Sequence, residues 1–297
     1  MTKTDPKDWT FKQASMYFLE DCETRNREPV KLSTLAAYRS HIKHIKAALG
    51  ERKLSCFTVA DMKDFVQVLV TKKLSPKRIE VIVSTLASIV AFPRDKNLNR
   101  LFTVSFPAKL IDRPRVNPRE QNAPIVSREV LEAAIAPKDE TALLLILLAS
   151  TGLRINEALN IKIQAPSDEA NTWSADTATV YVRVHLKTEP SWRDVELPRE
   201  VHEFLVTHAD LSKTELFPNG ETFYREIITE RNVPGFHSCR RFFETQLGRA
   251  FIPRAVLIYW MGHSGKTIGD RYDKNGDDSA FRRETRDRIP KGFDLPV

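Results

Sequence analysis

Apolar residues recur at every third or fourth position through the first third of the chain. This spacing is typical of amphipathic helices that bury one face. Helix starts are marked at Thr58, which opens a capping-box pattern, and at Ser75, which precedes Pro76 at a first helical position. The pattern predicts a four-helix unit over residues 8–110, with a short fifth element near Val104–Leu110. Its helices are expected at Phe11–Glu20, Leu32–Leu49, Thr58–Val70 and Pro76–Phe92.

A basic, proline-rich segment follows at residues 111–124. Its prolines interrupt any continuous helix, so a solvated linker between two domains is expected here. A basic linker can also lie along a phosphate backbone, and Arg113 and Arg115 are the candidate contacts.

Helical spacing of the apolar residues resumes at Ser127 and is interrupted by one segment of strand-like alternation. Residues 177–188 and 192–198 alternate around a Glu-Pro-Ser turn, which predicts a β-hairpin. The longest apolar run, Ala142–Ser150, is too short to span a bilayer and is typical of a buried core helix. Residues 125–297 are therefore predicted to be an α+β domain with a small antiparallel sheet, in a chain that is mainly α. Its helices are expected at Arg128–Ala136, Glu140–Ser150, Ile155–Ile161, Arg199–His208, Gly220–Arg231, His237–Ala250, Pro253–Trp260 and Ile268–Tyr272.

Composition and charge narrow the class of protein. The 297 residues suffice for two domains, and 46 Lys and Arg against 39 Asp and Glu leave a net charge of +7. That balance is expected of a phosphate-binding protein, although many other proteins are basic. Three dispersed cysteines and a polar N-terminus indicate no disulfide framework, no zinc knuckle and no signal peptide. A soluble intracellular protein is expected.

Several polar fragments carry candidate chemistry, and each is weak alone. Arg154 follows a Thr-Gly-Leu turn, with Glu157 one helical turn later. Lys187 lies near the tip of the predicted hairpin, and His237 and Arg240 share a helix face at i, i+3. Taken singly, these residues are more typical of structural roles than of catalysis: Arg154 of a surface arginine, Lys187 of a solubilising lysine, and the His237–Arg240 pair of a helix cap.

His41 and His44 lie one helical turn apart, each beside a lysine. A metal site is conceivable at that spacing, but a solvated or DNA-facing stripe is the favoured interpretation.

In their order along the chain, the polar fragments resemble the tyrosine recombinase (phage integrase) family. The matching phrases are TGLRINEAL, HLKTEPSWRDVELP, HSCRRFFETQL and MGHSGKTIGDRY. Small departures occur at Cys239, Arg241 and Met261, none of which carries the family's chemistry. The helical first unit is similar to the family's core-binding domain, so the resemblance covers nearly the whole chain. The family's catalytic residue types stand at Arg154, Lys187, His237, Arg240, His263 and Tyr272.

The resemblance implies that Tyr272 attacks a DNA phosphodiester, giving a 3′-phosphotyrosine and a free 5′-hydroxyl. A phenol is a weak nucleophile at neutral pH, and the transition state gathers negative charge on the phosphate oxygens. Arg154 and Arg240 would hold those oxygens in bidentate fashion, as a lysine cannot. They would take the role that a metal has in many nucleases, and no metal or cofactor is implied.

The remaining roles are assigned by the same resemblance. Lys187 would protonate the departing 5′-oxygen, and His237 would assist proton transfer from the nucleophile. His263 would donate a hydrogen bond to the phosphate. Glu157 would orient an arginine or a histidine.

The family also implies an architecture and partners. Core-binding and catalytic domains would form a C-shaped clamp on double-stranded DNA core sites, and a homotetramer on synapsed DNA would exchange strands through a Holliday junction. Accessory DNA-bending proteins are further candidate partners, and the location would be the cytoplasm, with the nucleoid. Residues 273–297 are expected to form either a short helix docked on a neighbouring protomer or a free tail. The candidate DNA contacts are Lys43, Lys77, Arg78, Arg113, Arg115 and Arg241.

The chain begins almost at the core-binding unit, so no arm-binding domain is expected, and a simple recombinase acting on short core sites is favoured. Two alternatives stay open. A type IB topoisomerase-like enzyme would nick and close DNA as a monomer. A DNA-binding regulator would have no turnover.

Overall fold

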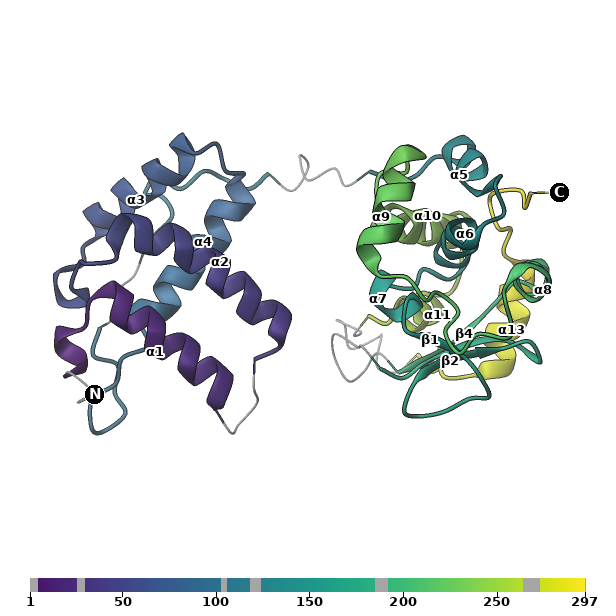
Figure 1. Ribbon diagram of the computed structural model, residues 1–297, viewed down its shortest axis with the longest axis horizontal. Helices are drawn as coiled ribbons and strands as arrows, with labels where there is room; N and C mark the ends of the chain where they lie inside the picture. Colours follow the sequence, from purple (N-terminus) through teal and green to yellow (C-terminus); the bar gives the residue numbers. More distant parts are fainter. Residues whose placement is uncertain are drawn as a thin grey trace. The chain divides into compact units, whose positions relative to one another are not determined.

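The computed structural model describes residues 5–25, 30–102, 106–117, 124–184, 192–263 and 273–296. The chain divides into two compact units, Met1–Gln121 and Asn122–Val297 (Figure 1). Each unit has its own hydrophobic core.

The first unit contains four helices: α1 (Phe11–Thr24), α2 (Leu32–Leu49), α3 (Val59–Thr71) and α4 (Pro76–Val90). Capping boxes begin α1 and α3, and the Ser75 hydroxyl caps α4, as the sequence pattern predicts. Short 3-10 turns lie at Pro6–Asp8 and Leu54–Cys56. Of the expected fifth element, residues 106–110 form only a hydrogen-bonded turn, and the core of this unit extends to Ile111.

The second unit is built around α6 (Glu140–Thr151), whose residues 141–151 are all buried. It packs against α5 (Arg128–Ile135), α8 (Arg199–His208), α9 (Glu221–Glu230) and α10 (Phe236–Arg249). Neighbours on all sides explain why the apolar run has no polar face. The other described helices of the unit are α7 (Ile155–Ala158), α11 (Arg254–Met261) and α13 (Ser279–Arg288).

A four-stranded sheet lies in the second unit (Figure 1). Its strands are β1 (Ile161–Ile163), β2 (Asn171–Ser174), β3 (Thr177–Val182) and β4 (Arg193–Glu196), in that spatial order. The predicted hairpin corresponds to β3 and β4, which pair antiparallel with Val180 opposite Val195.

The sheet corrects the prediction in two respects. It is mixed rather than antiparallel, because β1 runs parallel to β2. The helix expected to reach Ile161 ends at Ala158, and Ile161 begins β1. A strand of three residues is too short to show a period, and its outer hydrogen bonds go to the distant residues Thr214 and Leu216.

The C-terminal segment forms the expected short helix, α13, but this helix packs on its own chain beside β4. Arg282 Nε donates to the buried Glu196 carboxylate at 2.9 Å, and the Arg286 guanidinium lies over the rings of Phe243 and Trp260. None of the helices described in the chain is long and apolar enough to cross a membrane.

Candidate active site

Arg154 is placed by a glycine turn at the end of α6. Gly152 has a φ of +66°, and a Cβ at this position would lie 2.4 Å from the Phe243 ring. Only glycine fits that conformation and that space. Arg154 then starts α7, with its backbone N–H 2.8 Å from Glu157 Oε2 and its Nη1 2.8 Å from Glu157 Oε1.

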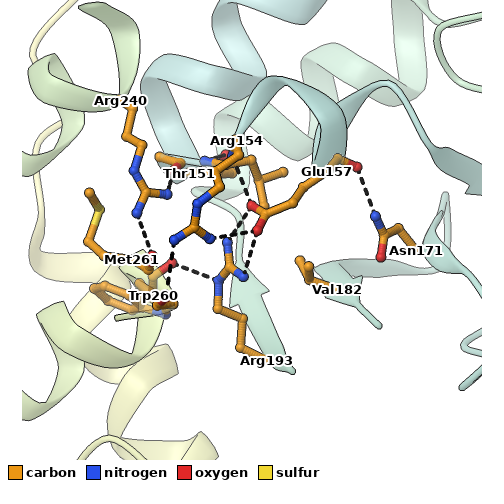
Figure 2. A network of polar contacts seen from close by, with 12 residues as sticks. Thr151, Arg154, Glu157, Asn171, Val182, Arg193, Arg240, Trp260 and Met261 are labelled. Atoms are coloured by element: carbon orange, nitrogen blue, oxygen red, sulfur yellow. Dashed lines mark hydrogen bonds and ion pairs between the residues drawn. The ribbon is translucent and has the colours of Figure 1, made fainter. Parts of the chain in front are cut away.

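Glu157 is a buried carboxylate shared by two arginines. Its second partner is Arg193 on β4, whose Nη2 lies 2.7 Å from Oε2 and whose Nη1 lies 3.3 Å from Oε1. Figure 2 shows the carboxylate between the two guanidiniums. Burial alone would raise the pKa of Glu157, but the charges and hydrogen bonds of Arg193 and Arg154 hold it below its ordinary value. The carboxylate is therefore ionised at neutral pH.

Arg240 reaches the same site from α10. Its side chain is buried, and it donates to the carbonyl oxygens of Gly152 and Met261 and to His263 Nε2, the last at 3.0 Å. Burial first, and the positive charge of Arg154 second, lower the pKa of Arg240 to about 10. Arg240 thus remains a cation at neutral pH, beside a second guanidinium and bonded to uncharged groups.

The C-terminal end of α11 holds all three arginines. The carbonyls of residues 260–262 accept in turn from Arg193 Nε at 2.8 Å, from Arg240 Nη2 and from Arg154 Nη2 at 3.2 Å. Carbonyls at a helix C-terminus lack helical partners and carry partial negative charge. Three cations from α7, β4 and α10 are therefore gathered at one helix end.

His237 and His263 are both exposed beside this cluster. Burial first, and then neighbouring arginines, lower the pKa of each imidazole below the ordinary 6.5. Arg240 can only donate, so His263 Nε2 accepts from it and the ring is neutral. Both histidines are available at neutral pH as uncharged imidazoles.

Two of the six residues assigned by family resemblance, Lys187 and Tyr272, lie outside the described residues. The other four, Arg154, Arg240, His237 and His263, come together within the second unit. Among the described residues, no group of three or more His, Cys, Asp or Glu side chains is placed to hold a metal ion.

The candidate DNA contacts differ in exposure and in whether the side chain already has a partner within the protein. Lys43 and Arg115 are exposed, whereas Lys77 and Arg113 both pair with Glu80, at 2.6 and 3.5 Å. In the second unit, the Arg241 guanidinium donates to the Pro124 carbonyl at 3.1 Å.

Arg78 is half-buried, and its guanidinium is hydrogen-bonded to a buried histidine. It donates to His41 Nε2 at 3.0 Å and to Ser40 Oγ at 2.8 Å. His41 is only 5% exposed and also contacts Thr85 Oγ1. The expectation of a solvated stripe is therefore wrong for His41, because its ring packs between α2 and α4 and orients an arginine.

Arg193 is the residue of this cluster that sequence analysis did not single out. One signal was present: in a strand, positions two apart share a face, so Arg193 points to the same side as the buried Val195. An arginine on the core face of a strand requires a buried acidic partner, which here is Glu157.

Residues 10–70 match the family model described as phage integrase, N-terminal SAM-like domain. Among curated protein sequences, no match to the chain was found.

Solved integrase structures share the fold over most of the chain. Tn1549 transposon integrase in complex with transposon right end DNA has a TM-score of 0.63 at 17% identity, covering 91% of this chain and 99% of that one. A lambda integrase dimer bound to a COC′ core site has a TM-score of 0.63 at 16% identity, covering 91% and 98%. A lambda integrase tetramer bound to a Holliday junction has a TM-score of 0.64 at 15% identity, covering 90% and 81%. The expected fold class, mainly α with a small sheet, is confirmed.

Proposed function

We propose that the chain is a member of the tyrosine recombinase (phage integrase) family, which the match of its N-terminal domain and its fold support, and that it is a site-specific DNA recombinase. It cuts and rejoins DNA through a 3′-phosphotyrosine on Tyr272. The observation that carries the proposal is the arginine cluster: Arg154 and Arg193 share the buried carboxylate of Glu157, and Arg240 is held beside them by backbone carbonyls.

This cluster has an excess of positive charge where a phosphate would bind. Arg154 is partly exposed, and within the described part of the chain Arg240 donates its hydrogen bonds to uncharged groups. Placed in a partly buried site, such cations stabilise developing phosphate charge far more than they would in water. Bidentate guanidinium forks also fix the orientation of the phosphorus for in-line attack.

In the proposed chemical step, one bond to phosphorus forms as another breaks. The Tyr272 oxygen forms a bond to phosphorus, and its proton passes to neutral His237. The bond from phosphorus to the 5′-oxygen breaks, and Lys187 supplies the proton to that oxygen. His263 bridges Arg240 and the phosphate. The reverse reaction with a new 5′-hydroxyl rejoins the strand without ATP, because the phosphodiester bond energy is kept in the phosphotyrosine.

We further propose that residues 8–110 form a core-binding domain and that 125–297 form the catalytic domain, joined by the linker 111–124. Four copies on two synapsed sites would exchange strands through a Holliday junction, as the tetrameric lambda integrase structure suggests. Double-stranded DNA is the partner, with accessory DNA-bending proteins as further candidates, and the cytoplasm is the proposed location.

The proposal is tested by trapping the covalent intermediate. We expect the protein to form a denaturant-resistant adduct with a pool of nicked duplexes that carry randomised cores, because a nick lets the cleaved strand diffuse away. Tyr272→Phe should abolish the adduct, and Tyr259→Phe should not, since the Tyr259 hydroxyl accepts from the Asp194 N–H within the fold. Sequencing the trapped DNA supplies the substrate for later measurements.

The absence of any adduct with the wild-type protein would overturn the enzymatic proposal in favour of a DNA-binding regulator. If the protein forms the adduct and relaxes supercoiled DNA but does not join a second duplex, the topoisomerase-like alternative is favoured.

The rate of adduct formation should fall on the acid side only below pH 6.5. The pKa values of His237 and His263 are lowered from that ordinary value, so both rings stay neutral until the pH falls further. A protonated His237 cannot take the phenol proton, and a protonated His263 cannot accept from Arg240. Single-turnover rates from about pH 5 to about pH 8 check this, with DNA binding measured at each pH. An acid limb centred above pH 6.5 would contradict it.

A further inference from the structure

Arg193 is a buried cation outside the six residues assigned to the reaction. Its side chain is 1% exposed, and its Nε, Nη1 and Nη2 each donate to a protein oxygen, so its fork is directed at the protein and not at DNA. Removing an arginine from water is energetically unfavourable, and a hydrophobic side chain of similar volume often stabilises a core as well or better. Packing alone therefore does not explain an arginine at this position.

The contacts of Arg193 connect two parts of the candidate active site, Glu157 on α7 and the C-terminal end of α11. Its fork holds the Glu157 carboxylate, which also orients Arg154, and its Nε holds the Trp260 carbonyl (Figure 2). The next two carbonyls along the chain hold Arg240 and Arg154. Since Arg193 ties the first of three successive carbonyls to β4, it also sets where the other two lie.

The turn that follows α11 is shaped around this side chain. Gly262 has a φ of +56°, and a Cβ there would lie 2.8 Å from Arg193 Nη1. The close approach brings the Gly262 carbonyl to Arg154 and sets the direction of the chain into His263. The backbone here thus accommodates the guanidinium of Arg193 specifically.

Charge gives Arg193 a second effect. Glu157 with Arg154 alone would be a neutral pair with a carboxylate directed at an incoming phosphate. With Arg193, two guanidiniums share that carboxylate, and the trio carries one net positive charge. Arg154 therefore keeps more of its attraction for an anion.

We propose that Arg193 is a positioning residue for strand cleavage. It fixes the end of α11 against β4, which sets the distance between the Arg154 and Arg240 guanidiniums that bind the phosphate. It also neutralises part of the Glu157 carboxylate, which leaves Arg154 more positive charge for the phosphate. This inference rests on the proposed function. Arg193 acts through the two arginines and not by contact with the reacting atoms.

The test compares Arg193→Gln and Arg193→Lys with Arg282→Gln. Arg282 is a matched control, because it is also a buried arginine on a buried glutamate, with its Nε 2.9 Å from Glu196. The probe is the nicked duplex recovered from the wild-type adduct. We expect Arg193→Gln to slow adduct formation at saturating DNA by about 10- to 100-fold, with little change in the Kd for DNA. Lysine, which keeps the charge without the fork, should restore part of that rate.

Arg282→Gln should lower the Tm without a comparable loss of rate. The inference is overturned if Arg193→Gln or Arg193→Lys cleaves at the wild-type rate, if the loss lies in Kd alone, or if Arg282→Gln slows cleavage equally. Should Arg193→Gln fail to fold, the rate of the lysine variant decides. If the wild-type protein forms no adduct, the proposed function fails instead.

Discussion

Arg240→Lys should reduce the rate of adduct formation by roughly 100- to 1,000-fold, the usual effect of losing one preorganised donor to a transition-state oxyanion. Arg240 divides its donors among two carbonyls and His263, which aims the rest of the fork. An ammonium group keeps the charge but cannot span those acceptors and also face a phosphate. Single-turnover cleavage of the recovered nicked duplex measures the effect.

Arg249→Lys is the control for this substitution. Arg249 lies on the same helix, α10, and its side chain is exposed at the last turn, away from the cluster. We expect the control to cleave at close to the wild-type rate. Equal rates for Arg240→Lys and the wild-type protein would show that Arg240 is a structural arginine.

Glu157→Gln should destabilise the protein by about 3–5 kcal/mol, because it leaves two guanidiniums without the buried carboxylate that neutralises them. Glu157 and Arg193 are each 1% exposed, so water cannot replace the lost charge. The free energy of unfolding, measured with urea at neutral pH, gives the magnitude.

The pH dependence of stability provides a further check on Glu157. Its pKa is lowered in the folded protein, so its contribution is present above the ordinary value of 4.5 and is lost as the pH falls through the folded value. The Gln variant should lack that part of the acid destabilisation. Glu203→Gln, at the exposed pair with Arg199, is the control and should leave stability nearly unchanged. If Glu157→Gln lowers the free energy of unfolding by less than about 1 kcal/mol, the carboxylate is not essential to the stability of the cluster.

Local patterns predicted the helices well because caps and periodicity are properties of neighbouring residues. Thr58 and Ser75 cap α3 and α4 where the sequence indicates. Strands β1 and β2 were missed, since β1 has three residues and β2 four, and their pairing depends on segments far along the chain.

In the candidate site, too, contacts between neighbours in the sequence could be predicted and contacts between distant residues could not. The Arg154–Glu157 contact arises within one helical turn and follows from spacing. The pairing of Glu157 with Arg193 joins residues 36 positions apart, so only the folded arrangement reveals it. The side on which α13 packs is equally a tertiary property, and the helix lies on its own chain beside β4.

Covalent attachment of Tyr272 to DNA is the central step of the proposed reaction. Its most direct test is to digest the purified adduct with nuclease and protease and to locate the residual nucleotide by mass spectrometry. We predict a 3′-linked nucleotide on the peptide that contains Tyr272, in an amount that accounts for the adduct. A nucleotide on a different residue, or an adduct of undiminished yield from Tyr272→Phe, would contradict it.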